Sequence, residues 1–267
     1  MKTGFLITAR LKSTRLKLKL LLPLNGKTVI ERVIERAKSV SGIDEIVLCT
    51  SKESQDLPLV RIAADQDIYY FNGHPDDVLM RLHDAAIFYH MDYFIGITAD
   101  NPLFSIYYAN ILCDMVKQDP SIDFAVTTGL PVGMNIYAIK TKALQVICKV
   151  KQEIDTEIWG SLINRPEIFN VVEYPVKKED AIPVERVTLD EPLDFMFFKK
   201  IYNSYPPDYV IEEPDLQNLL IGQPDMKDIN SCVVQASLTE EKRIQIDDFF
   251  KSHHDHILKV KNQIYSV

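Results

Sequence analysis

A basic segment near the start of the chain has the composition of an anion-binding site. Its five cations lie within residues 8–19 and are Arg10, Lys12, Arg15, Lys17 and Lys19. Guanidinium groups make forked contacts with phosphate oxygens, ammonium groups act as point charges, and Ser13 and Thr14 add hydroxyls. A charge run by itself is more often a solvated loop, but this one directly follows the apolar run 4–9, which is typical of a buried strand. We therefore predict a polyphosphate site here.

The same segment differs from a Walker P-loop. The glycines of that motif are missing, and no helix follows the Lys12-Ser13 pair. The predicted phosphate contacts therefore belong to another class of nucleotide site.

Two aspartates follow segments that are expected to be strands. Asp100 comes after residues 93–98, and Asp190 comes after residues 186–189. Carboxylates at separate strand ends can converge on one Mg²⁺, which binds one or two carboxylates together with phosphate oxygens and waters. Each aspartate also suits a helix N-cap, because Asp190 precedes Pro192 and Asp100 precedes an Asn-Pro pair. We favour the metal role for Asp100 and leave both roles open for Asp190.

The elements that must position these residues alternate between strands and helices. Strands are expected at residues 4–9, 45–50, 68–71, 93–98, 124–127 and 186–189, and helices at 29–38, 76–89, 108–117, 192–205, 215–221 and 239–260. This alternation predicts an α/β fold of three layers, with a mostly parallel sheet between two layers of helices. Ligands of such folds bind beyond the carboxyl ends of the strands, which is where the basic segment and both aspartates are expected.

The rhythm changes after residue 129, and this change suggests how the chain is divided. Residues 1–230 would form one domain. Within it, residues 129–185 contain several prolines and the only tryptophan, and we expect them to leave the sheet as a lid or a subunit contact. Residues 231–267 would form a helical C-terminal extension that packs on the domain or on a partner.

The overall composition limits the classes of partner. The chain has 267 residues, 46% hydrophobic and 25% charged, and its 30 basic and 38 acidic side chains give a net charge of −8. An acidic protein does not favour nucleic acid or an anionic membrane as a partner. Its four cysteines are widely spaced, and no apolar run approaches the length of a membrane span. We therefore expect a cytoplasmic protein without a nucleic-acid or membrane partner.

Five motifs in order along the chain resemble the cytidylyltransferases that activate acidic sugars. The motifs are A-R-L-K-S-T-R-L-K-L-K at 9–19 with L-P-L-N-G-K at 22–27, G-H-P-D-D-V-L-M-R at 73–81, T-A-D-N-P-L at 98–103, P-V-G-M-N at 131–135 and R-V-T-L-D-E-P-L-D at 186–194. The family includes CMP-3-deoxy-manno-octulosonate synthetase and acylneuraminate cytidylyltransferase. The branch that this chain resembles best is the spore-coat polysaccharide biosynthesis protein F type, and the similarity runs from about residue 4 to residue 230.

The resemblance implies a fold, an activity and a set of partners. The fold is that of the nucleotide-diphospho-sugar transferases. The activity is Mg²⁺-dependent transfer of CMP from CTP to a sugar acid or a related small-molecule acceptor, with release of pyrophosphate, for synthesis of a cell-surface polysaccharide or glycoconjugate. By analogy with the family, we expect a homodimer.

The resemblance and the positions of the residues together define a predicted site. The predicted catalytic residues are Arg10, Lys19 and Asp100, and the predicted metal ligands are Asp100 and Asp190. The predicted nucleotide-binding residues are Ala9, Arg10, Ser13, Arg15, Lys19, Thr50, Ser51 and Arg81. Asp76 and Asp77 have a structural interpretation, in which one of them caps the following helix and Arg81 pairs with either.

Departures from the family pattern leave the acceptor open. Leu18 stands where the family usually has glycine, Ala99 replaces another glycine, and Asn135 and Tyr137 stand where acidic residues are usual. Cations that could bind the carboxylate of a sugar acid are Lys140, Lys142, Arg165 and Arg186. Two alternatives therefore remain, namely a nucleotidyltransferase for a phosphorylated sugar or polyol and a non-catalytic nucleotide-binding or partner-binding module.

Overall fold

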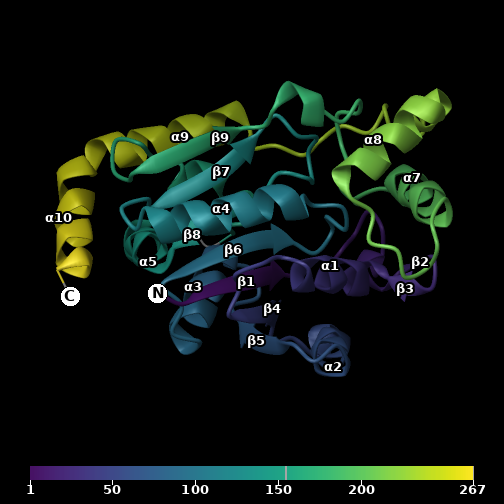
Figure 1. Cartoon of the computed structure of the whole chain (residues 1–267). Coiled ribbons are helices and arrows are strands. Elements are labelled where there is room, and N and C mark those ends of the chain that lie inside the picture. Colours follow the sequence, from purple (N-terminus) through teal and green to yellow (C-terminus); the bar gives the residue numbers. More distant parts are fainter. Residues whose placement is uncertain (154, 267) are drawn as a thin grey trace.

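A mixed sheet of seven strands crosses the molecule in the computed structural model, which describes residues 1–153 and 155–266 (Figure 1). The strands follow one another in the order β5 (Tyr69–Gly73), β4 (Glu45–Ser51), β1 (Thr3–Thr8), β6 (Tyr93–Thr98), β8 (Tyr137–Lys140), β7 (Phe124–Thr128) and β9 (Val171–Pro175). β8 runs antiparallel to β6 and β7, whereas the remaining pairings of this sheet are parallel. The predicted mostly parallel sheet is confirmed.

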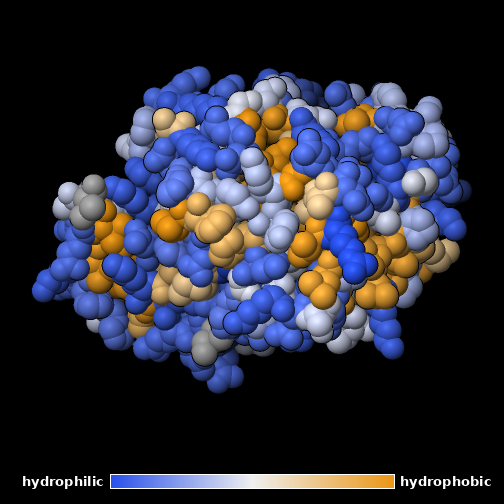
Figure 2. All heavy atoms as spheres, turned by 90° about the horizontal axis from the view of Figure 1, so that it is seen from below, coloured by the Kyte–Doolittle hydropathy of each residue, from blue (hydrophilic) through white to orange (hydrophobic). Residues whose placement is uncertain are grey.

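Helices cover both faces of the sheet because its strands send alternate side chains to opposite sides. In β1, Phe5 and Ile7 enter one hydrophobic core, and Leu6 between them enters the other. The first core lies under α1 (Val29–Lys38), α2 (Leu57–Asp65), α4 (Ile106–Gln118), α7 (Pro192–Asn203) and α8 (Glu213–Gly222). The second lies under α3 (Val78–Phe88), α5 (Thr141–Val150) and α6 (Gly160–Ile163). The predicted three layers are therefore present, and the outer surface seen from below is mainly hydrophilic with separate apolar areas (Figure 2).

Helix α1 shows how local sequence defines these elements. It follows a short hairpin of β2 (Pro23–Leu24) and β3 (Lys27–Thr28). Thr28 and Glu31 form a capping box, in which the hydroxyl of Thr28 accepts from the N–H of Glu31 and the Glu31 carboxylate accepts from the N–H of Thr28. The apolar side chains of α1 then face the first core at helical spacing, so the predicted helix 29–38 is confirmed.

Two predictions about the middle of the chain were wrong. The segment 129–185 does not leave the sheet throughout, because β8 and β9 both belong to it and β8 lies between β6 and β7. The other strands were predicted from the alternation of strands and helices along the chain. The short antiparallel strand β8 does not follow that alternation. Residues 186–189 do not form a strand, and Arg186 makes only an isolated parallel bridge with Val132.

The C-terminal extension is helical, but the single helix expected at 239–260 is two helices. α9 (Glu240–Ser252) ends at His253, whose N–H donates to the carbonyl of Phe249, and α10 (His254–Tyr265) then begins in a new direction. Ile246 and Ile257, one on each helix, are buried in the second core. The turn lets both helices follow the domain surface, far from α7 and α8 (Figure 1). Among the residues that the structure describes, no helix combines the length and apolar character that a membrane crossing requires.

A glycine in β6 lets β8 place an aromatic ring against the sheet. Gly96 pairs with Tyr137 across the antiparallel ladder, and a β-carbon at Gly96 would collide with the Tyr137 ring. Tyr137 in turn packs edge-on against Trp159, with ring centroids 4.8 Å apart. This stack fixes the chain next to Trp159, including Glu157 and Ile158.

We predict that Gly96→Ala lowers the free energy of unfolding by about 1 to 3 kcal/mol, because the added methyl overpacks a buried site. Equilibrium unfolding in urea measures the change. Gly222→Ala is the matched control, since a β-carbon there meets no neighbouring atom within 4 Å. Equal stability of the Gly96→Ala and wild-type proteins would contradict the proposed contact.

Candidate active site

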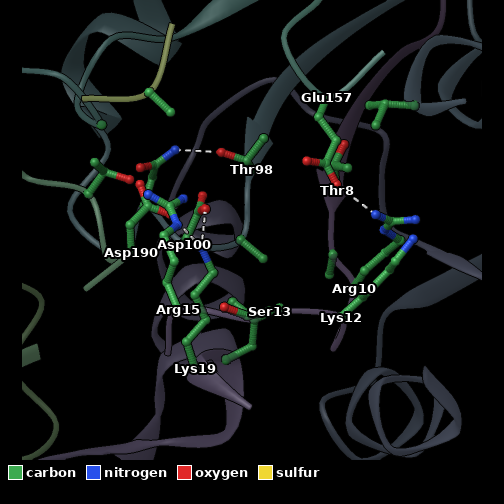
Figure 3. Close-up of a pocket in the computed structure, with 18 of the residues that line it drawn as sticks. Thr8, Arg10, Lys12, Ser13, Arg15, Lys19, Thr98, Asp100, Glu157 and Asp190 are labelled. Carbon is green, nitrogen blue, oxygen red and sulfur yellow. Dashed lines mark hydrogen bonds and ion pairs between the residues drawn. The ribbon is translucent and has the colours of Figure 1, made fainter. Parts of the chain in front are cut away.

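A cavity of about 520 Å³ opens at the carboxyl ends of β1 and β6 (Figure 3). Its lining comes from the loop after β1, the loop after β6, α3, and four later segments of the chain. The lining residues include Ala9, Arg10, Lys12, Ser13, Arg15, Lys19, Arg81, Asp100, Asn101, Glu157, Ile158, Asp190, Gln235 and Ala236. The position agrees with the rule that ligands of parallel α/β sheets bind beyond the strand ends.

The main chain brings the two predicted metal ligands together. The N–H of Ala99 donates to the carbonyl of Thr8 at 2.9 Å, so the loop after β6 starts beside the loop after β1. The N–H of Leu189 donates to the carbonyl of Asp100, also at 2.9 Å. These two bonds place Asp190 next to Asp100 although the residues are far apart in sequence.

Lys19 links the two aspartates through its ammonium group. Its Nζ atom lies 2.7 Å from Oδ2 of Asp100 and 2.8 Å from Oδ1 of Asp190, and all three side chains meet on one side of the cavity (Figure 3). Burial by itself would lower the pKa of Lys19, but the charges and hydrogen bonds of the two carboxylates outweigh it and raise the pKa. Burial would likewise raise the pKa of Asp190, yet Lys19, Arg15 and Arg186 lower it. Lys19 and Asp190 are therefore charged at neutral pH.

Leu18, directly before Lys19, has a left-handed backbone with φ 53° and ψ 31°. A side chain in this conformation costs roughly 1–2 kcal/mol, whereas glycine adopts it readily. The loop thus keeps a backbone shape suited to glycine although the residue is Leu18. Its side chain is exposed, and it does not fill the cavity.

The alternative role of the two aspartates as helix caps was wrong. Ser105 caps α4, and Glu191 forms the capping box of α7 with Asp194. Asp190 instead accepts a hydrogen bond from Arg186 at 3.4 Å, and Arg186 also donates to Asp194 at 2.8 Å. Neither Asp100 nor Asp190 therefore caps a helix, and both line the cavity.

The donor set at this position fits Mg²⁺. Two carboxylates converge on one point, where the structure has the positive charge of the Lys19 ammonium. Within residues 1–153 and 155–266 no group of three or more His, Cys, Asp and Glu side chains could hold a metal ion by itself. Mg²⁺ would complete its coordination with phosphate oxygens and waters, as it usually does at nucleotide sites.

A second group of charges lies on the opposite side of the cavity (Figure 3). Arg10 donates to the carboxylates of Asp76 at 3.0 Å and Glu157 at 2.6 Å, and also to the carbonyl of Pro75. Lys12 contacts Asp76 at 3.1 Å, and this hydrogen bond is the main reason why the pKa of Asp76 is lowered. Cations thus stand on both walls, so a polyphosphate lying across the cavity could contact both.

The family of the chain follows from its match to a family model. The cytidylyltransferase model matches residues 5–201, which include every motif described above. The chain belongs to the cytidylyltransferase family.

Individual relatives of this cytidylyltransferase agree with the family match. The uncharacterized protein MJ1063 of Methanocaldococcus jannaschii is 29% identical over 247 residues, which cover 90% of this chain and 99% of the relative. The spore coat polysaccharide biosynthesis protein SpsF of Bacillus subtilis is 23% identical over 230 residues, covering 83% of this chain and 95% of the relative.

Solved structures show the same fold. A cytidylyltransferase from Leptospira borgpetersenii superposes with a TM-score of 0.79 at 24% identity and covers 90% of this chain and 100% of its own. A CMP:2-keto-3-deoxy-manno-octonic acid synthetase complexed with CTP has a TM-score of 0.62 at 18% identity, covering 76% of this chain and 99% of its own. The predicted nucleotide-diphospho-sugar transferase type of fold is thereby confirmed.

The structure brings most of the predicted site residues of the cytidylyltransferase to the cavity. Those that line it are Ala9, Arg10, Ser13, Arg15, Lys19, Arg81, Asp100 and Asp190. Arg15 lies 3.2 Å from Asp190 and 3.3 Å from Glu191. Arg81 is fully buried, and its Nη1 atom donates to the carbonyls of His74 and Pro75 rather than to Asp76 or Asp77. Asp77 caps α3, which confirms the prediction that one of the two aspartates caps this helix.

Thr50 and Ser51 are the exceptions. Both are buried at the end of β4 and do not line the cavity. The hydroxyl of Ser51 donates to Asp56 at 2.5 Å, and the same carboxylate accepts from the N–H of Leu11 at 2.7 Å. Asp56 therefore joins the end of β4 to the loop after β1 through Ser51, while the hydroxyl of Thr50 is buried without a hydrogen-bond partner. The predicted contact of Thr50 and Ser51 with a nucleotide is not supported by their positions outside the cavity.

The cavity also contains residues that sequence reasoning missed. Glu157, Ile158, Gln235 and Ala236 come from segments without a recognisable motif, and their only signal is tertiary. Asn101 could have been found, because it follows Asp100 directly. By contrast, the cations proposed for a sugar acid do not line this cavity, and they are Lys140, Lys142, Arg165 and Arg186.

We predict that Lys19→Met lowers the free energy of unfolding at neutral pH by about 3 kcal/mol, because two facing carboxylates lose their partner. The folded pKa of Asp190 is lowered, so this stabilisation is present above the unfolded value of about 3.9 and is lost as the pH falls through the folded pKa. On the alkaline side it persists until the pH rises through the raised pKa of Lys19. Urea unfolding across the acid range should show the gap between wild type and variant closing.

The matched control is Lys149→Met, which removes an exposed lysine of α5 outside the cavity. Its stability should stay within about 0.5 kcal/mol of wild type at every pH. A gap for Lys19→Met that is absent at neutral pH would contradict the assigned ion pairs.

Proposed function

We propose that this cytidylyltransferase transfers the CMP group of CTP to a sugar acid or a related small acceptor, releases pyrophosphate and uses Mg²⁺ held by Asp100 and Asp190. The observation that carries the proposal is the meeting of Lys19 with these two carboxylates at the strand ends, opposite the cation Arg10. Membership of the family supports the use of a cytidine nucleotide. The product would supply a cell-surface polysaccharide, in keeping with the name of the Bacillus subtilis relative.

The proposed reaction forms a bond between an acceptor oxygen and the α-phosphorus of CTP while the bond from that phosphorus to pyrophosphate breaks. Negative charge on the phosphoryl oxygens dominates such a transition state, so positioned cations supply most of the catalysis. Arg10, Ser13 and Lys19 would bind the triphosphate, and Arg15 and the buried Arg81 would add positive charge to the walls. Bound Mg²⁺ would supply further charge neutralisation. Main-chain groups at Ala9 would contact the base.

The state of the protein in solution belongs to the same proposal. We expect a homodimer that forms through the segment 129–185 and a cytoplasmic location, where CTP is available. The acceptor class is left to the product assay, because a phosphorylated sugar or polyol would use the same nucleotide site.

We predict that Asp100→Asn lowers turnover with CTP, Mg²⁺ and acceptor by about a hundredfold or more, because the metal site loses a charged ligand. Pyrophosphate release, coupled to a pyrophosphatase and phosphate assay across a panel of sugar acids and polyol phosphates, measures the loss. Asp114→Asn changes an exposed aspartate of α4 outside the cavity and should keep full activity. A fully active Asp100→Asn protein would remove the metal assignment.

We also predict that Arg10→Ala weakens CTP binding by about tenfold or more, since a charge-assisted hydrogen bond contributes about 1.5–3 kcal/mol. Titration calorimetry in Mg²⁺ gives the dissociation constant. Arg61→Ala, an exposed arginine of α2 outside the cavity, is the control and should bind as wild type does. If the wild-type protein does not bind CTP at all, the proposed function is wrong.

A further inference from the structure

A second cavity of about 360 Å³ adjoins the active-site cavity. One wall consists of Ile158, Gly160 and Ser161, and the facing wall comes from residues 236–238, Arg243 and Asp247. Ile158 and Ala236 line both cavities, so they form a neck between the two spaces. The volume falls within the range of small-molecule sites.

Contacts at both walls hold this neck beside the proposed metal ligands. Arg186 donates to the side chain of Gln235 at 2.5 Å and to Asp190 at 3.4 Å, so the segment that carries Ala236 is tied to the carboxylate site. On the facing wall, Trp159 packs against Tyr137 of β8. The neck consists of loop residues, and these contacts tie it to β8 on one side and to the carboxylate site on the other.

The polar groups of the second cavity suit an anion that carries hydroxyls. Asp247 is neutralised by Arg165 at 2.6 Å. Arg243 forms no ion pair with any residue that the structure describes, so its charge is available to a ligand. The hydroxyl of Ser161 is buried without a hydrogen-bond partner, and a buried polar atom of this kind favours a ligand that can pair with it.

The origin of the walls separates this cavity from the nucleotide site. The family model ends at residue 201, and the wall from Ala236 to Asp247 lies beyond it. By contrast, the cations and carboxylates that face the proposed triphosphate all lie within the matched residues. A part of the chain outside the common domain is well placed to determine which acceptor is used.

We infer that the second cavity is the acceptor subsite, an inference that rests on the proposed function. The acceptor is a small anion with several hydroxyls. Its negative group lies at Arg243, its hydroxyls pair with Ser161 and Ser237, and its attacking oxygen reaches the α-phosphorus through the neck. The negative group is a carboxylate or a phosphate, since a guanidinium binds both.

The test compares Arg243→Gln with Lys251→Gln in the full chain. Lys251 is an exposed lysine on the same helix, α9, and lines neither cavity, so both variants lose one positive charge from that helix. The probes are 3-deoxy-manno-octulosonate and N-acetylneuraminate as carboxylates, glycerol 3-phosphate as a phosphate, and sorbitol as an uncharged polyol. Each is titrated with CTP and Mg²⁺ by pyrophosphate release, and by calorimetry with a non-hydrolysable CTP analogue bound.

Arg243→Gln should raise the KM and the dissociation constant of the anionic probe by about tenfold or more while those of CTP stay unchanged. Arg243→Lys should recover part of the loss, and Lys251→Gln should match wild type. Ser237→Phe, which fills part of the second cavity at an exposed position outside the active-site cavity, should also weaken probe binding and leave CTP binding intact. These results would support the subsite whether or not Arg243→Gln alters stability.

Three outcomes would overturn the inference. They are unchanged probe binding in both Arg243→Gln and Ser237→Phe, equal binding of sorbitol and the anions, and a wild-type protein that binds CTP but none of the anionic probes. Each of these leaves the proposed nucleotidyl transfer standing. A wild-type protein that binds no CTP would instead overturn the proposed function and the inference with it.

Discussion

One shared ammonium group holds the site together. Asp100 and Asp190 come from segments 90 positions apart in the numbering, and both carboxylates lie within 2.8 Å of the Lys19 Nζ atom. Two partly buried carboxylates that contact the same atom would repel each other if that atom carried no positive charge. The loop after β1, the loop after β6 and the segment before α7 are thus joined through one electrostatic contact, and Mg²⁺ would satisfy the same requirement when nucleotide binds.

A network of buried charges extends this contact into the C-terminal extension. Arg186 binds Asp190 and Asp194, and Asp194 also accepts from the side chain of Asn230 at 2.9 Å. Arg186 further donates to Gln235. Breaking a buried pair leaves an uncompensated charge, so these contacts stabilise the position of residues 230–235 beside Asp190. The path from Asp190 to residue 235 explains how a segment outside the family match can lie at the candidate active site.

Packing on the sheet fixes the facing wall in a different way. Gly96 leaves room for the Tyr137 ring, and Tyr137 supports Trp159, the residue that follows Ile158. No charge is needed there, because aromatic side chains bury large areas and pack with defined geometry. One wall of the neck thus depends on electrostatics and the other on packing.

The sequence by itself determined the layers, most helix positions and the nucleotide side of the site, because periodicity, capping and motifs such as residues 98–103 are local. Tertiary structure alone decided three things: that β8 lies inside the sheet, that Thr50 and Ser51 are buried away from the cavity with Ser51 bonded to Asp56, and that Glu157 and Gln235 line it. The physical reason is that such contacts join residues distant in the chain, whose approach depends on packing and on charge pairing. Local sequence patterns do not show which distant residues pack together or pair their charges.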